Sequence, residues 1–297
     1  MIVRGRPSFR DVIFAVRGSI LRRIVRPLLF MLVVSGVAVL LAQAHPLYFA
    51  GLAAMPFTLI GLSLSIFMSF RNTACYDRWW EGRKLWGQLI IASRSFSRQV
   101  ATVEPSRRDP LLRGLCGFAA GLAARLRGSD EYAAIARHVG DGPWAGAPNP
   151  TDAVLAAVGR GCRELAGAGP TDAIHYSLLE TQLNEMAHVQ GGCERIKSTP
   201  LPFSYSLLLH RTAYAFCLLL PFALAPSLGW WTPLPTVLVC YAFFGLDALG
   251  DELSDPFGTE PNDLPLDAMV RTIERDLLHA MGRDLPPPLE ARDYVLL

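Results

Sequence analysis

Few of the residue types that carry out catalysis occur at catalytic spacings in this chain of 297 residues. The six histidines form no HExxH motif and no pair one helical turn apart, so nothing supports a helical zinc site. The chain has no phosphate-binding loop, no GxSxG motif and no GxGxxG motif. The six cysteines form no CxxC pair and are interpreted as small buried side chains. We therefore predict that the protein is not an enzyme.

The distribution of charge is more informative than its total. Hydrophobic residues make up 51% of the chain and charged residues 18%, with a net charge of +2 and a mean hydropathy of +0.28. No Asp, Glu, Lys or Arg occurs over the 44 positions 27–70 or the 35 positions 212–246. This composition excludes a disordered chain, and the balanced charge argues against a nucleic-acid binder.

The two uncharged stretches are each long enough for a pair of membrane spans. A hydrocarbon core of ~30 Å is crossed by about 20 helical residues. Polar or turn-forming residues divide the stretches, which predicts spans at 27–42, 48–70, 206–228 and 234–250. Trp230 and Trp231, between the last two spans, are typical of a membrane interface. The alternative is a soluble protein with two buried helical hairpins.

Positive charge flanks the spans on one side only. Seven arginines and one acid precede the first span, and the short turns within each pair of spans have no Lys or Arg. The positive-inside rule then places both termini and the middle of the chain in the cytoplasm. The predicted segments are a basic arm (1–26), a transmembrane hairpin (27–70), a cytoplasmic helical domain (71–205), a second hairpin (206–250) and an acidic C-terminal segment (251–297).

The two cytoplasmic segments at the middle and the end of the chain also have the patterns of helices. Apolar residues recur at helical spacing in the middle segment, and Asp152 and Thr171 are predicted to cap helices that follow them. The C-terminal segment contains 11 acids and 4 bases and is predicted to form one helix at 265–281. We therefore expect an all-α fold.

Two kinds of transport remain open from the residues alone. A secondary carrier needs an ionisable group among its spans, and Asp247 is the candidate, although it also fits a carboxylate at the end of a span. A passive pore needs no such group. Leu62, Ile66 and Phe70 recur every four residues and form one helical stripe, which suits a pore, a lipid contact or helix packing. Four spans do not enclose a water path alone, so a pore requires a symmetric homo-oligomer.

Three motifs in order make the chain similar to a known family. The sequence FRNTACYDRWWE at 70–81 resembles the stretch after the second span of bestrophins. The sequences GCERI at 192–196 and TPLP at 199–202 resemble the entry to the third span of that family, and DPFGTEPND at 255–263 resembles the segment after the fourth. The chain thus resembles a bacterial bestrophin. The resemblance implies an ion channel in the inner membrane, a homopentamer with four transmembrane helices per subunit around one axial pore.

The resemblance also assigns roles to residues of this chain. It makes Leu62, Ile66 and Phe70 an apolar pore neck, and Ile174 with its neighbour Ser177 a cytoplasmic aperture. The equivalents of the calcium clasp of animal members would be Asp255, Glu260 and Asp263. A proline interrupts this run, which is poorer in acid than the animal pattern, so no cofactor is expected, with calcium as the one candidate.

The ion that passes is predicted from the bacterial character of the sequence. Bacterial relatives imply monovalent cations, whereas the animal members imply the alternative, a chloride channel. The acidic C-terminal segment would attract cations if it lined the entrance, and the basic arm would have the opposite effect or bind anionic lipids. Expected partners are therefore other copies of the chain, membrane lipids and permeating ions. A secondary carrier and a membrane-anchored enzyme or scaffold remain the other hypotheses.

Overall fold

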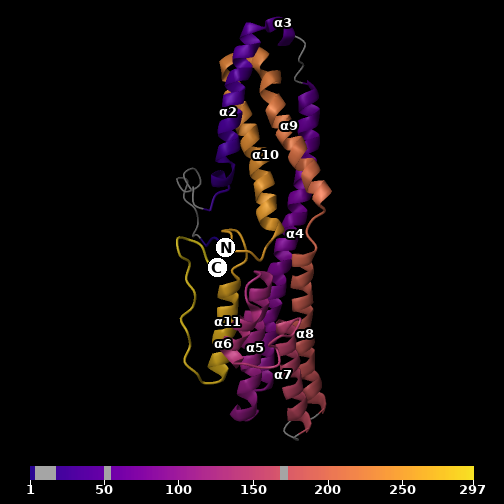
Figure 1. The fold of residues 1–297 in the computed structure, drawn as a ribbon, viewed down its shortest axis with the longest axis vertical. Coiled ribbons are helices and arrows are strands. Elements are labelled where there is room, and N and C mark those ends of the chain that lie inside the picture. The colour runs from indigo at the N-terminus through magenta and orange to yellow at the C-terminus, as the bar shows by residue number, and fades with distance from the viewer. Residues whose placement is uncertain (4–17, 50–54, 168–172) are drawn as a thin grey trace. The chain divides into compact units, whose positions relative to one another are not determined.

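The computed structural model describes residues 1–3, 18–49, 55–167 and 173–297. The regular elements of this described part are all helices, apart from two isolated β-bridges near the termini, which confirms the predicted all-α class (Figure 1). The helices are α2 (Leu21–Ala44), α3 (Pro46–Phe49), α4 (Met55–Gln99), α5 (Pro105–Leu126), α6 (Glu131–Val139), α7 (Pro150–Gly167), α8 (Ala173–Ser198), α9 (Phe203–Leu228), the 3-10 turn η1 (Gly229–Trp231), α10 (Pro233–Ser254) and α11 (Leu266–Ala280).

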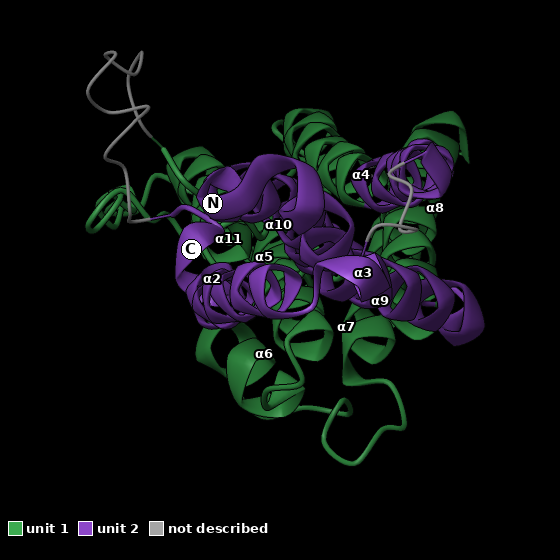
Figure 2. Cartoon of the chain, turned by 90° about the horizontal axis from the view of Figure 1, so that it is seen from above, with its two compact units in different colours: residues 1–4, 79–199, 255–297 green, residues 5–78, 200–254 purple. Residues whose placement is uncertain are grey.

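The chain forms two compact units, coloured separately in Figure 2. Unit 1 comprises Met1–Arg4, Trp79–Thr199 and Asp255–Leu297, and unit 2 comprises Gly5–Arg78 and Pro200–Ser254. Unit 1 therefore holds most of the predicted middle segment together with most of the acidic C-terminal segment. The five predicted segments stay a prediction about membrane topology, and most of the basic arm (4–17) lies outside the described residues.

Unit 2 is a bundle of apolar helices. Its core joins Leu64 and Met68 of α4 to Phe216 of α9 and Phe244 of α10, and residues of α2 complete it. Because the sequence predicts that these helices lie in a bilayer, close packing and interhelical hydrogen bonds are the main stabilising contributions within the unit. Many apolar side chains on the outer surfaces remain exposed, as expected of helices that face lipid or a further subunit.

Three of the described helices are long and apolar enough to cross a membrane, namely Leu21–Ala44, Phe203–Trp231 and Pro233–Ser254. They cover the spans predicted at 27–42, 206–228 and 234–250. The span predicted at 48–70 is not among them. Residues 50–54 lie outside the description, and α4 continues for 45 residues, so its apolar part is followed within the same helix by Arg71 and Asn72.

Unit 1 is built around helix α5. Its small residues let α6, α7 and α11 pack closely, and Trp86 and Phe96 of α4 join Phe118 of α5 in the core. Gly121 is one position where this close packing requires glycine, because a Cβ there would lie 2.8 Å from the Ile135 side chain of α6.

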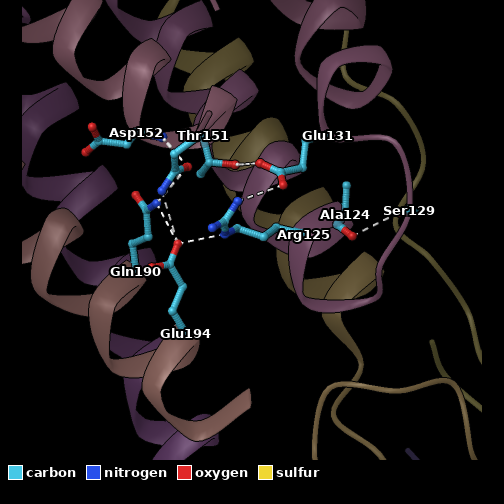
Figure 3. Close-up of polar contacts among 9 residues, drawn as sticks. Ala124, Arg125, Ser129, Glu131, Thr151, Asp152, Gln190 and Glu194 are labelled. Carbon is cyan, nitrogen blue, oxygen red and sulfur yellow. Dashed lines mark hydrogen bonds and ion pairs between the residues drawn. The ribbon is translucent and has the colours of Figure 1, made fainter. Parts of the chain in front are cut away.

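A polar network links four helices of unit 1 (Figure 3). Arg125 of α5 pairs with Glu131 of α6 at 2.9 Å and with Glu194 of α8 at 2.8 Å. The buried Thr151 of α7 donates to Glu131 at 3.0 Å. Glu131 and Arg125 therefore connect helices that are distant in the sequence, and their charges are compensated where they are partly shielded from water.

One predicted helix cap is wrong. Helix α7 begins at Pro150, and the Asp152 N–H donates to the side-chain oxygen of Asn149 at 3.1 Å. Asn149 therefore caps the helix, because proline at the first helical position moves the start of α7 ahead of Asp152. The other predicted cap, Thr171, lies outside the described residues.

We expect Gly121→Ala to lower the free energy of unfolding of unit 1 by about 1–3 kcal/mol, because the added methyl group overpacks the contact with Ile135. Thermal unfolding of the purified protein measures this. Gly191→Ala is the control, since a Cβ at that position of α8 meets nothing within 4 Å. Equal unfolding midpoints for the two variants would contradict the packing described for α5.

Candidate functional site

The predicted pore-neck residues form an exposed apolar stripe on α4. In the single chain, Leu62 is 60% exposed, Ile66 47% and Phe70 62%. The opposite face holds Leu64 and Met68, which are buried against α9 and α10. The structure thus places the three predicted residues on one face and leaves that face without cover from its own unit.

Polar groups beside this stripe are satisfied within α4 itself. The Ser65 hydroxyl donates to the Gly61 carbonyl at 2.8 Å, and the Thr73 hydroxyl donates to the Ser69 carbonyl at 3.0 Å. The donor of each hydroxyl is thus used within the helix. The stripe therefore presents an apolar surface to whatever lies next to it.

The exposed stripe continues beyond Phe70 to a carboxylate. Thr73 and Asp77 are also exposed, and they follow Phe70 by three and seven residues on the same helix. Seven residues complete almost two helical turns, so Asp77 lies on the same face as Phe70. Asp77 is the first acidic residue on that face after the neck, a feature that the sequence analysis did not single out.

Behind the stripe lies an ionic cluster, which we call the Arg71 cluster (Arg71, Asp247, Asp251 and His210), and Arg71 and Asp247 are its buried members. Arg71 Nη1 donates to Asp247 Oδ1 at 2.9 Å, and Nη2 pairs with Asp251. His210 Nδ1 lies 2.8 Å from the other Asp247 oxygen. The Arg71 side chain is 2% exposed and that of Asp247 5%. Asp247, proposed from the sequence as a carrier group or a span-end carboxylate, is thus part of an ion-pair network.

The predicted aperture residues lie on α8 in unit 1. Ile174 is 74% exposed, although isoleucine is usually buried, and Ser177 one turn later is also exposed. Both side chains therefore stand on a free face near the start of their helix.

The three predicted calcium ligands do not converge. Asp255 pairs with Lys197 at 2.8 Å, Glu260 is exposed, and Asp263 is buried and accepts from the Glu260 N–H at 2.8 Å. Asp263 thus closes its own loop by accepting from a backbone N–H three residues earlier. Among the described residues no group of three or more His, Cys, Asp or Glu side chains is arranged to hold a metal. This geometry does not fit the six to eight oxygens that calcium needs.

Three buried cysteines of unit 1 are poor nucleophiles. Burial raises the pKa of the Cys116, Cys162 and Cys193 thiols to about 12, so these cysteines stay protonated at neutral pH. His175 Nε2 lies 2.8 Å from the Gln99 carbonyl and serves to join α8 to α4.

Comparison with known proteins gives consistent matches over the whole chain. The family model described as Bacterial/Fungal Bestrophin protein matches residues 1–279. A voltage-dependent anion channel-forming protein of Mesorhizobium japonicum is 43% identical over 99% of this chain and 96% of its own length. The corresponding protein of Escherichia coli (strain K12) is 39% identical over 94% of this chain and 93% of its own length.

Solved structures resemble the fold as well. The crystal structure of a bacterial bestrophin homologue from Klebsiella pneumoniae superposes with a TM-score of 0.84 at 39% identity. The match covers 88% of this chain and 99% of that one.

We expect Asp263→Ala to destabilise the protein by about 1–2 kcal/mol, because the partly buried N–H of Glu260 loses its acceptor. Glu260→Ala, at an exposed side chain of the same loop, is the matched control and should change little. Thermal unfolding with calcium and then with a chelator measures both effects. A calcium-dependent rise in the midpoint that Asp263→Ala abolishes would contradict the structural role of this loop.

Proposed function

Since this chain belongs to the bacterial and fungal bestrophin family, and is thus a membrane ion-channel protein and not an enzyme, we propose that it assembles as a homopentamer around one axial pore. The exposed stripe of Leu62, Ile66 and Phe70 is the observation that carries this proposal. A single chain leaves the stripe uncovered, whereas a symmetric ring turns it inward and removes it from lipid.

In the ring, each neck position supplies five identical apolar side chains. A narrow apolar constriction excludes water when it closes, so it gates ions without a charged group at the narrowest point. Ile174 and Ser177 form a second constriction at the cytoplasmic aperture. The exposed position of Ile174 near the start of α8 supports this role.

We place the channel in the inner membrane with four crossings per subunit and both termini in the cytoplasm. The termini support an even number of crossings, since the Met1 amino group donates to the Leu296 carbonyl at 2.5 Å and the Val3 N–H to the Tyr294 carbonyl at 2.8 Å. Ends that are bonded together lie on the same side of a membrane. The three candidate spans therefore need a fourth, for which the apolar half of α4 is the candidate.

Passive conduction fits the charges better than a carrier mechanism does. A coupled carrier uses an intramembrane ionisable group that binds and releases its ion. Asp247 is instead held by Arg71 at 2.9 Å, with His210 at 2.8 Å. The channel conducts without bound calcium, because Asp255, Glu260 and Asp263 do not converge.

Asp77 supports selectivity for monovalent cations. Five copies on the neck face make a ring of carboxylates, and such rings are used by cation channels. The second candidate is an anion channel, favoured by the names of the relatives from Mesorhizobium japonicum and Escherichia coli. In a cation channel the Asp77 carboxylates lie on the ion path and attract the permeating ion, whereas in an anion channel they would repel it.

Replacing Ile66 and Phe70 together by Ala should raise ion flux by about tenfold or more, because the widened neck no longer excludes water. Efflux from liposomes that contain the purified protein measures the change. Leu238→Ala is the control, since Leu238 of α10 is 68% exposed and stands outside the stripe. Unchanged flux in a well-folded neck variant would contradict the neck assignment.

Asp77→Asn should shift the reversal potential of bilayer currents under a salt gradient toward zero, because the cation-attracting ring loses its charge. The unmodified protein should show the sign of cation conduction. A reversal potential of anion sign, unchanged in the Asp77→Asn variant, would establish the second candidate.

A further inference from the structure

We propose that Arg71 is the positioning residue of the pore neck. Its ion pairs with Asp247 and Asp251 hold α4 against α10 in the orientation in which Phe70 narrows the pore. This inference rests on the proposed neck and adds the group that fixes its shape.

Arg71 reaches α10 through both terminal nitrogens of its guanidinium, whereas its Nε is buried without a hydrogen-bond partner. Its Nη1 donates to both the side chain and the backbone carbonyl of Asp247, at 2.9 and 3.2 Å, and its Nη2 pairs with Asp251. A buried arginine without its carboxylates would leave an uncompensated charge, so α4 and α10 separate only at a large cost. The pairing therefore acts as a fixed joint between the two helices.

This joint fixes the rotation of α4 about its own axis as well as the distance between α4 and α10. Asp247 and Asp251 are four residues apart on α10, so the planar guanidinium spans one turn of that helix and fixes the axial position. Phe70 and Arg71 are consecutive on α4, about 100° apart around the helix axis. Fixing the direction of Arg71 therefore fixes the direction in which Phe70 points.

Gly250 makes the close approach feasible. A Cβ at Gly250 would lie 2.5 Å from the Asn72 side-chain oxygen and 2.9 Å from Arg71 Nη1. A methyl group at this position of α10 would displace the ends of the Asn72 and Arg71 side chains without changing a charge. Gly250→Ala is thus an independent means to disturb the same joint.

The other packed helices contribute charges to the same region. His210 of α9 contacts Asp247 at 2.8 Å, and Arg23 of α2 pairs with Glu252 of α10 at 3.5 Å. The Arg71 cluster thus connects α4 to α9 and α10, and a second pair ties α2 to α10. Loss of Arg71 removes the contact that fixes the rotation of α4, so the direction of Phe70 is no longer fixed.

The test compares Arg71→Gln and Gly250→Ala in two backgrounds, the natural neck and the Ile66→Ala, Phe70→Ala neck. Ion efflux is measured from liposomes that contain the purified full-length protein. Both variants should raise flux about fivefold with the natural neck and add no increase to the widened neck, because they act through the same constriction. Arg71→Lys keeps the positive charge but loses the planar guanidinium with its two terminal nitrogens, so it should give an intermediate flux. Arg211→Gln, at an exposed arginine of α9, is the charge-matched control and should leave flux unchanged.

Several results would overturn the proposal. Equal flux increases in both backgrounds would show a leak elsewhere, and unchanged flux in Gly250→Ala and Arg71→Gln would show that the joint does not set the neck. Unfolding midpoints and elution volumes show whether each variant folds. If Arg71→Gln does not fold, Gly250→Ala alone decides the outcome. Failure of the widened neck itself to raise flux would refute the proposed function, which is a separate result.

Discussion

The apolar half of helix α4 has one face that is buried within unit 2 and one face that is exposed. Leu64, Met68 and Arg71 are buried against α9 and α10, whereas Leu62, Ile66 and Phe70 are exposed in the single chain. Apolar packing alone allows a helix to slide and rotate, but a buried arginine paired with carboxylates does not. The position of the exposed stripe therefore depends on the ionic contacts behind it.

The sequence predicted the helices well where charge and periodicity are local signals. The uncharged stretches correspond to α2, α9 and α10, and the helix predicted at 265–281 matches α11. Asn149 was missed as a cap because Pro150 moves the start of the helix. The Arg71–Asp247 pair was missed because its members are 176 residues apart, so no local pattern in the sequence links them.

The site was predictable only in part for a similar reason. The spacing of Leu62, Ile66 and Phe70 indicates a stripe but not what the stripe faces, and resemblance to bestrophins supplied the function. Asp77 was inside the motif that carried the resemblance, yet its place on the neck face follows only from the unbroken helix. The acids at 255–263 looked like a cation site by composition, whereas the fold uses them for an ion pair and a turn.

The central claim is that the Leu62, Ile66 and Phe70 face of α4 borders the ion path, and charged thiol reagents test it most directly. All six natural cysteines are buried, so an introduced one reports its own surroundings. We predict that a water-soluble methanethiosulfonate reagent changes the current of the Phe70→Cys channel and leaves Ile60→Cys, on another face of α4, unaffected. Modification of Ile60→Cys with no effect on Phe70→Cys would contradict the account.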